Sequence, residues 1–298
     1  MHGAFAPTTA EPLTTVDGVL SLVFRPAHDG TDISTVVDIL AQRPPLRVVR
    51  PFRLPDGAAL LHLHNVSGGV VKGDRLAMEV EVRPGARAQL TTTGATRIYG
   101  GRHTESSAQQ DTTITVGEDA LLEYLPDPLI PYAGSVYLQR TRFTLAAGAG
   151  LFAWDVFAPG RAARGEIFAY DRLGWETTIA AGDIPIVVER ACLEPGVRPV
   201  DSPARLGPYR YFASFYACRV GVDAGQWANV ERSLAALACE LTVPGTTLWG
   251  ASCLPAHGIA IRGVSMTGRS LLAALPRFWS AAKRLLYGQE SHMPRKIY

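Results

Sequence analysis

The sequence predicts a mainly β protein of layered, stacked antiparallel sheets, with an α+β C-terminal part that carries two helices. Three observations support this fold class. Apolar and polar residues alternate from Leu76 to Arg83, which is typical of a half-buried strand. A weak repeat aligns Ala86, Ala120 and Ala149, which are 34 and 29 residues apart. Apolar residues take up helical spacing only after residue 223.

The repeat favours three strand–turn–strand units that stack side by side, as in a β-helix. Three loose copies are equally typical of the hairpins of a sandwich, so both architectures remain open. We expect a flexible tail at residues 1–16, a β scaffold at 17–200 and an α+β part packed on it at 201–298. The Pro- and Gly-rich run 195–208 is the expected boundary.

Before the repeat, the sequence predicts strands at 18–24, 34–40 and 60–64. The closely spaced prolines of residues 43–52 exclude a helix there and indicate an extended segment. After the repeat, we expect strands at 151–157, 166–170, 177–180, 184–193 and 211–222, and later at 247–254 and 258–264.

Two helices are expected near the C-terminus. Asp223 and Gln226 form a plausible capping box for the first, which Pro244 ends. Its expected buried stripe is Trp227, Val230, Leu234, Leu237 and Leu241. The second helix is predicted at 270–287, with Pro276 kinking it or marking its first turn and Gly288 capping its end. Its expected stripe is Leu272, Leu275, Trp279, Ala282 and Leu286.

Composition excludes several classes of function. Hydrophobic residues make up 47% and charged residues 19% of the chain, which supports a substantial core. A net charge of +2 argues against nucleic acid and anionic membranes as partners. No apolar run approaches the roughly 20 residues of a membrane helix, and the N-terminus lacks the pattern of a signal peptide. We therefore expect a soluble, cytoplasmic protein.

A glycine-rich loop is the most distinctive local feature. Gly68, Gly69 and Gly73 precede Asp74, so the loop delivers one carboxylate to the entrance of an expected β-hairpin. The spacing of Gly68 and Gly73 resembles a phosphate-binding loop. However, Asp74 and Arg75 stand where Lys and Ser/Thr are needed, and a strand follows in place of a helix.

Acidic residues interrupt several apolar strands, namely Glu123, Asp155, Glu166 and Glu189. An unpartnered buried carboxylate is costly, so three explanations compete. The acids face solvent, or they pair with arginines such as Arg161, Arg164 and Arg190, or they converge with Asp74 on an internal polar route for a cation.

A permanent metal site is not expected. His62 and His64 share one strand face and could form half a site, although strand histidines are more often ordinary surface or core residues. The four cysteines lack C-x-x-C spacing and are expected to be buried, reduced thiols. If a metal is handled, scattered oxygen ligands favour transient handling.

The sequence gives little support for an enzyme. Acids on a layered β scaffold resemble those of glycoside-cleaving folds, which need two carboxylates about 5 to 9.5 Å apart and normally aromatic platforms for the sugar. Two of the five tryptophans, Trp227 and Trp279, fall on the core stripes of the expected helices. The chain has no G-x-S-x-G motif and no short-range Cys–His signature.

Several blocks of sequence resemble the urease accessory protein family UreD, also called UreH. The blocks are GGVVKGDRL, TTTGATRIY, LEYLPDPLIPYAGS, LFAWDVFAPGRAARGEIF, VVERACL and PRKIY, in the family's order. Lys72 replaces a usual glycine and Thr93 a usual proline. The first 60 residues and the region 195–215 match poorly.

The resemblance implies a mainly β, non-catalytic urease maturation factor. Such proteins bind apo-urease and form a complex with UreF and the GTPase UreG, while UreE supplies nickel. The resemblance places Asp74, Asp155, Glu166 and Glu189 at the family's acidic positions, as candidates for a transient Ni²⁺ path with no permanently bound cofactor. Asp155 stands where many relatives carry Glu. The residues expected to shape the motifs are Gly68, Gly69, Gly73, Gly94, Arg161 and Gly165. The alternative role is a pure scaffold without metal contact.

Overall fold

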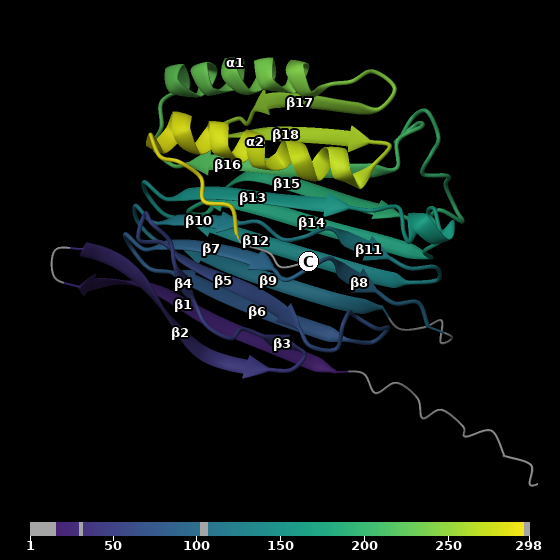
Figure 1. The fold of residues 1–298 in the computed structure, drawn as a ribbon, viewed down its shortest axis with the longest axis horizontal. Coiled ribbons are helices and arrows are strands. Elements are labelled where there is room, and N and C mark those ends of the chain that lie inside the picture. Colours follow the sequence, from purple (N-terminus) through teal and green to yellow (C-terminus); the bar gives the residue numbers. More distant parts are fainter. Residues whose placement is uncertain (1–15, 30–31, 102–106, 295–298) are drawn as a thin grey trace, which may run out of the picture.

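The computed structural model describes residues 16–29, 32–101 and 107–294, which form two β-sheets and a layer of helices (Figure 1). The first sheet has the order β15 (Ile184–Leu193), β14 (Arg172–Ala181), β12 (Val136–Leu145), β9 (Ala108–Val116), β6 (Arg75–Val82), β1 (Asp17–Asp29), β2 (Asp32–Arg43). The second has the order β17 (Thr247–Cys253), β18 (Gly258–Ser265), β16 (Tyr211–Arg219), β13 (Gly150–Phe157), β10 (Leu121–Tyr124), β7 (Arg87–Thr92), β5 (Ala59–Asn65), β3 (Leu46–Arg47). Short strands β4 (Phe52–Arg53), β8 (Thr96–Ile98) and β11 (Leu129–Pro131) flank the second sheet.

The mainly β class with two C-terminal helices is confirmed, but the expected antiparallel pairing is wrong for the centre of both sheets. Strands β1, β6, β9, β12 and β14 pair in parallel, as do β5, β7, β10 and β13. Antiparallel pairs occur toward the ends of both sheets. The cause is that each turn carries the chain from one sheet to the other, so equivalent strands of successive units lie side by side.

Each copy of the sequence repeat therefore corresponds to one layer of a β-helix-like stack. Leu121 lies opposite Arg87 on one side and Gly150 on the other, which reproduces the spacings of 34 and 29 residues. The turn at Pro84 and Gly85 joins β6 of the first sheet to β7 of the second, so the expected hairpin at this point is wrong.

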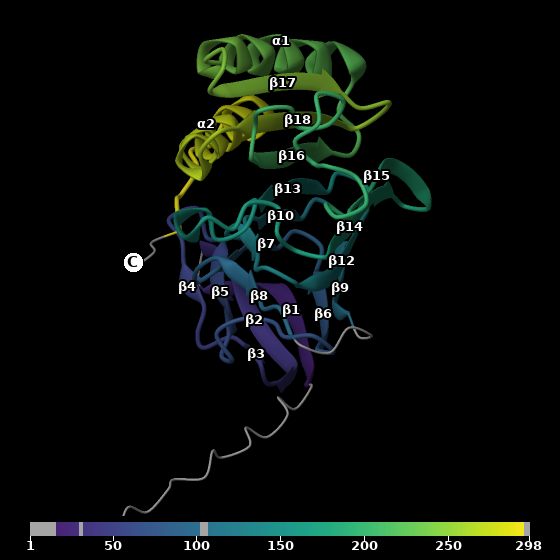
Figure 2. The ribbon, with the colours of Figure 1, turned by 90° about the vertical axis from the view of Figure 1, so that its right-hand side faces the viewer.

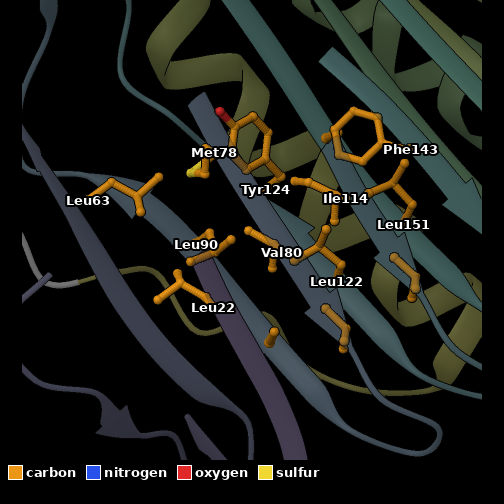
Figure 3. Close-up of a cluster of buried hydrophobic side chains, with 14 of the residues drawn as sticks. Leu22, Leu63, Met78, Val80, Leu90, Ile114, Leu122, Tyr124, Phe143 and Leu151 are labelled. Atoms are coloured by element: carbon orange, nitrogen blue, oxygen red, sulfur yellow. The ribbon is translucent and has the colours of Figure 1, made fainter. Parts of the chain in front are cut away.

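The two sheets face each other across a shared apolar core (Figure 2). Strand β6 alternates between exposed and buried side chains along its whole length, as its sequence predicts. The buried members meet inward-facing leucines, isoleucines and aromatic rings of neighbouring units, including Ile114, Leu122, Tyr124 and Phe143 (Figure 3).

Helices α1 (Ala224–Leu241) and α2 (Gly268–Tyr287) pack together at the β17–β18–β16 end of the second sheet (Figure 1). The Asp223 carboxylate accepts a hydrogen bond from the Gln226 backbone N–H at 3.0 Å, as the predicted cap requires. Gly288 ends α2 with φ of 63°, also as predicted. Leu272 is wrong as a core residue because its exposed fraction is 42%, and its neighbour Leu271 is buried instead.

Other expectations need correction. Residues 166–170 form no strand, because the chain there makes a compact loop with a short 3-10 helix, η1 (Ala162–Arg164), and a positive φ at Phe168. All four cysteines are free, but Cys192 and Cys239 are exposed. Pro276 lies inside α2.

The expected tail lies outside the described residues except for residue 16, and the division into domains stays a prediction. Among the described helices, none combines the length and the apolar character that crossing a bilayer requires.

Candidate functional site

A ladder of threonines crosses the interior of the first sheet. Thr112, Thr141 and Thr177 are register partners on β9, β12 and β14, and all three are buried. The next partner in the row is Glu189 on β15. The Thr112 hydroxyl has no hydrogen-bond partner among the residues that the structure describes. Since buried polar groups are normally paired, this ladder is an unusual polar strip in an apolar core.

A second polar row leads to Asp155. Gln110 on β9 and Gln139 on β12 are register partners. Tyr137 donates a hydrogen bond from its hydroxyl to Gln110 Oε1 at 3.2 Å. Gln139 Nε2 donates to Asp155 Oδ1 at 3.1 Å across the space between the sheets. The glutamine row of the first sheet therefore ends at a carboxylate of the second sheet.

Asp155 and Glu189 are joined by two hydroxyl groups. Thr177 neighbours Glu189 in the first sheet, and its hydroxyl lies 3.5 Å from Asp155 Oδ2. Ser214 neighbours Asp155 in the second sheet, and its hydroxyl lies 3.4 Å from Glu189 Oε1. Burial, and secondarily the charge of Glu189, raise the pKa of Asp155 to about 6.

Glu189 sits where this polar band reaches the surface. Its side chain is 17% exposed and is paired with Arg262 Nη1 at 2.6 Å. Trp175 Nε1 donates to Glu189 Oε1 at 3.3 Å, and the Tyr216 hydroxyl donates to Oε2. Sequence analysis named Arg190 as a possible partner of these acids, but Arg190 pairs with Glu176.

The inner end of the band borders a cavity of about 290 Å³ between the sheets. Asp155, Gln110 and Gln139 line it together with the glycine loop. Its other sequence-predicted lining residues are Gly68, Gly69, Gly94 and His64. The structure thus brings the glycine loop and Asp155 to one cavity, although 87 residues separate Gly68 from Asp155 in the sequence.

Asp74 lies outside this cavity and supports the backbone. It is buried, and its two carboxylate oxygens accept hydrogen bonds from the N–H groups of Val16 at 3.1 Å and Val71 at 3.0 Å. Gly73 has φ of 89°, which only glycine adopts easily, and this turn brings the carboxylate under the loop. Both oxygens of Asp74 are therefore committed to holding the N-terminal end of β1 against the glycine loop.

Glu166 is likewise held in a local structural pair. Arg161 donates two hydrogen bonds to its carboxylate, and the hydrogen bond with Arg161 lowers the pKa of Glu166 despite the opposing effect of desolvation. The guanidinium of Arg161 lies over the ring of Tyr132 at 4.4 Å. Gly165 ends η1 with φ of 78°. For Glu166, the predicted pairing with a nearby arginine is confirmed.

The glycine loop and the Arg161 loop touch through two tyrosines. The Tyr99 hydroxyl donates to the Gly68 carbonyl at 3.2 Å, and a Cβ at Gly69 would overlap the Tyr99 ring. Tyr99 packs edge to face on Tyr132, with ring centroids 5.0 Å apart. The motif residues therefore lie in the loops of successive units, along one side of the stack.

Glu123 belongs to a separate buried network that anchors α2. Lys283 has no exposed side-chain surface and pairs with Glu123 at 2.9 Å and Asp56 at 3.1 Å. Burial raises the pKa of Glu123, whereas for Asp56 the charge and hydrogen bond of Lys283 outweigh desolvation and lower the pKa. This network faces away from the polar band.

The described residues hold no group of three or more His, Cys, Asp or Glu side chains that could chelate a metal. His62 packs edge to face on Phe52, and His64 borders the cavity. All five tryptophans are buried, so none of them is an exposed platform for a sugar ring. The site is a band of polar side chains, with Asp155 and Glu189 as its two carboxylates.

Comparison with known proteins gives this arrangement its context. The sequence profile described as UreD urease accessory protein matches residues 16–297. The chain belongs to this family. It is 46% identical to "Urease accessory protein UreD" of Herpetosiphon aurantiacus over 290 residues, covering 97% of this chain and 99% of that protein. It is 32% identical to the UreD protein of Deinococcus radiodurans over 273 residues, covering 91% of each.

Within this UreD chain, sequence reasoning missed the threonine ladder, Ser214, Tyr216, Arg262 and Lys283. One signal was present, since Thr112 and Thr141 are 29 residues apart, the same as Ala120 and Ala149 of the repeat. The partner of Glu189 carried no local signal, because Arg262 lies 73 residues further along the chain.

Proposed function

We propose that this UreD protein is a cytoplasmic urease maturation factor without catalysis of its own, and that Ni²⁺ passes through its polar band. The observation that carries the proposal is the continuous band of oxygen ligands that links the cavity at the glycine loop with Glu189 at the surface. Such a band costs stability in an apolar core, so a function that needs it is the simplest reason for its presence.

The ligand chemistry suits cargo that must be released. Asp155 and Glu189 supply carboxylates, while Thr177 and Ser214 supply neutral oxygens. Thiolate and imidazole ligands would hold Ni²⁺ tightly, since nickel stands high in the affinity order of divalent metals. Oxygen ligands spread over two sheets bind more weakly and allow the ion to move on. The ion is therefore cargo, and no resident metal is required.

The partners in this proposal are those of the urease maturation system. The protein binds apo-urease directly and joins UreF and the GTPase UreG, while UreE delivers nickel to the assembly. Names of the relatives, which call them urease accessory proteins, support this placement.

A scaffold without metal contact is the second candidate, and three observations favour it. Asp74 is committed to backbone N–H groups, Glu166 to Arg161, and Glu189 to Arg262. In this reading the β stack joins urease to UreF and nickel travels elsewhere.

The maturation role is tested by co-expressing urease apoprotein, UreF and UreG with and without this chain. We expect co-elution of the chain with urease, and nickel content and urease activity that depend on its presence. Normal activation without the chain, together with its elution alone, would contradict the role.

A further inference from the structure

The outer end of the polar band is closed by a cation of the protein itself. Arg262 Nη1 lies 2.6 Å from Glu189 Oε2 and 3.3 Å from the Tyr216 hydroxyl, and it also donates to Ser214 Oγ. The guanidinium lies over the Tyr216 ring at 5.6 Å. Arg262 therefore occupies the side of the Glu189 carboxylate to which an arriving cation would bind.

The strand register places Arg262 in line with the band. Asp155, Ser214 and Arg262 are successive partners on β13, β16 and β18 of the second sheet. Glu189 reaches this row from the first sheet through its contact with Ser214. The order from the cavity outward is therefore Asp155, then Ser214 and Glu189, then Arg262.

The exposure of Arg262 distinguishes its ion pair from the buried pair elsewhere in the molecule. Its side chain is 52% exposed, whereas Lys283, which pairs with Glu123, is completely buried. Because solvent hydrates the half-exposed guanidinium, this pair holds its cation less firmly than a fully buried pair. The Arg262 side chain can rotate into solvent and keep its own charge hydrated, which leaves Glu189, 17% exposed, open to another cation, whereas the Lys283 side chain cannot reach solvent.

We propose that Arg262 is an exchangeable counter-ion for Glu189, which closes the outer end of the path at rest and yields the carboxylate to a divalent cation. The proposal rests on the proposed function and adds the means by which the path is closed when empty. A divalent ion near both Asp155 and Glu189 gains attraction from two carboxylates, whereas Arg262 pairs with Glu189 alone. A monovalent ion at the same place gains only half of this attraction and leaves Arg262 in place.

Trp175 offers a direct reporter of this exchange. Its indole N–H donates to Glu189 at 3.3 Å, so Ni²⁺ bound at Glu189 lies next to the indole and quenches its fluorescence. Trp175→Phe provides the assignment control. The Trp175 ring packs in a tilted arrangement against Phe157 and Phe212, with ring centroids 4.6 Å and 5.0 Å apart, and a phenylalanine can retain these contacts.

The experiment titrates the full-length chain with Ni²⁺ alone and follows tryptophan quenching in wild type, Arg262→Gln, Arg262→Lys and Glu189→Gln. We expect Arg262→Gln to bind about tenfold more tightly than wild type, because a competing charged hydrogen bond is removed. Arg262→Lys keeps the positive charge and should stay close to wild type. Glu189→Gln and Trp175→Phe should abolish the signal.

Two results would overturn the proposal, and they differ in what else they reject. Glu189-dependent quenching with the same affinity in wild type and a folded Arg262→Gln rejects the counter-ion role and leaves the nickel path intact. The absence of Glu189-dependent quenching in both rejects the counter-ion role together with a nickel path through Glu189. Circular dichroism of each variant separates either result from misfolding.

Discussion

Asp155 and Glu189 come from different sheets and meet through Thr177 and Ser214, each of which neighbours one acid in its own sheet and contacts the other acid across the core. This four-residue arrangement joins the two sheets with polar groups inside a largely apolar interior. It also sets two negative charges close together, and the consequences for stability and for cation binding can be tested separately.

Asp155→Asn should stabilise the protein above pH 6 and have little effect near pH 4. Burial raises the pKa of Asp155 from 3.8 to about 6, so between these two pH values the folded protein holds a proton that the unfolded chain has lost. Stability is then full below the unfolded pKa and falls as pH rises through the folded pKa, by up to about 3 kcal/mol. An asparagine cannot ionise and escapes this loss. Thermal unfolding of wild type and Asp155→Asn at pH 4.5 and 8.0 measures the stability difference between them. An equal difference at both pH values would contradict the prediction.

Thr112→Val should leave the fold intact or stabilise it by about 1 kcal/mol, because the buried hydroxyl of Thr112 has no partner within the described part of the chain. If the ladder carries nickel, the same variant should slow urease activation. Thr113→Val is the matched control, since Thr113 is the next residue on β9 and is exposed. Denaturant unfolding and activation rates are measured for both. Loss of stability in Thr112→Val would show that its hydroxyl has a structural partner.

Asp74→Asn should destabilise the protein by roughly 1–3 kcal/mol, since an amide can accept at only one of the two positions that now receive N–H groups from Val16 and Val71. Any loss of urease activation in this variant should follow the loss of folded protein. Glu79→Gln, on the exposed face of β6, serves as control. A fully stable Asp74→Asn that assembles but fails in activation would return Asp74 to the nickel path.

Lys283→Met should cost about 3–5 kcal/mol, because it leaves the buried Glu123 and the partly buried Asp56 without their cation. Lys283→Met combined with Glu123→Gln should recover part of this loss, since it removes the unpaired charge of Glu123. Urea unfolding of the single and double variants measures the difference. Additive losses in the double variant would mean that the two side chains are not coupled.

Local patterns predicted much of this fold. The alternation in β6 and the cap at Asp223 depend on neighbouring residues, and the repeat depends on similar turns at regular spacing. Each of these predictions is confirmed. Strand direction was mistaken because alternation is the same in parallel and antiparallel strands. The arginine that pairs with Glu189 could not be predicted from neighbouring residues. Arg190 is adjacent to Glu189 in sequence, but successive strand residues face opposite sides of the sheet. The residue that pairs with Glu189 is therefore Arg262 of β18, and Arg190 pairs with Glu176.

The candidate site was predictable only in part. Asp155 and Glu189 stood out as acids within apolar strands, and both belong to the band. Asp74 and Glu166 stood out equally, although the structure commits their carboxylates to a turn and to Arg161. Threonine is common in strands, so the ladder could be recognised only once the register was known.

The passage of nickel through the band is tested most directly by Asp155→Asn and Glu189→Gln, with Glu79→Gln as the exposed acidic control. Each variant is co-expressed with urease apoprotein, UreF and UreG, and the nickel content and activity of the urease are measured alongside co-purification. We predict that the assembly forms in all three and that nickel content and activity fall together in the first two by about tenfold or more, the scale of losing one charged ligand. Full nickel loading of urease in both the Asp155→Asn and the Glu189→Gln variant would contradict the path and leave the scaffold role.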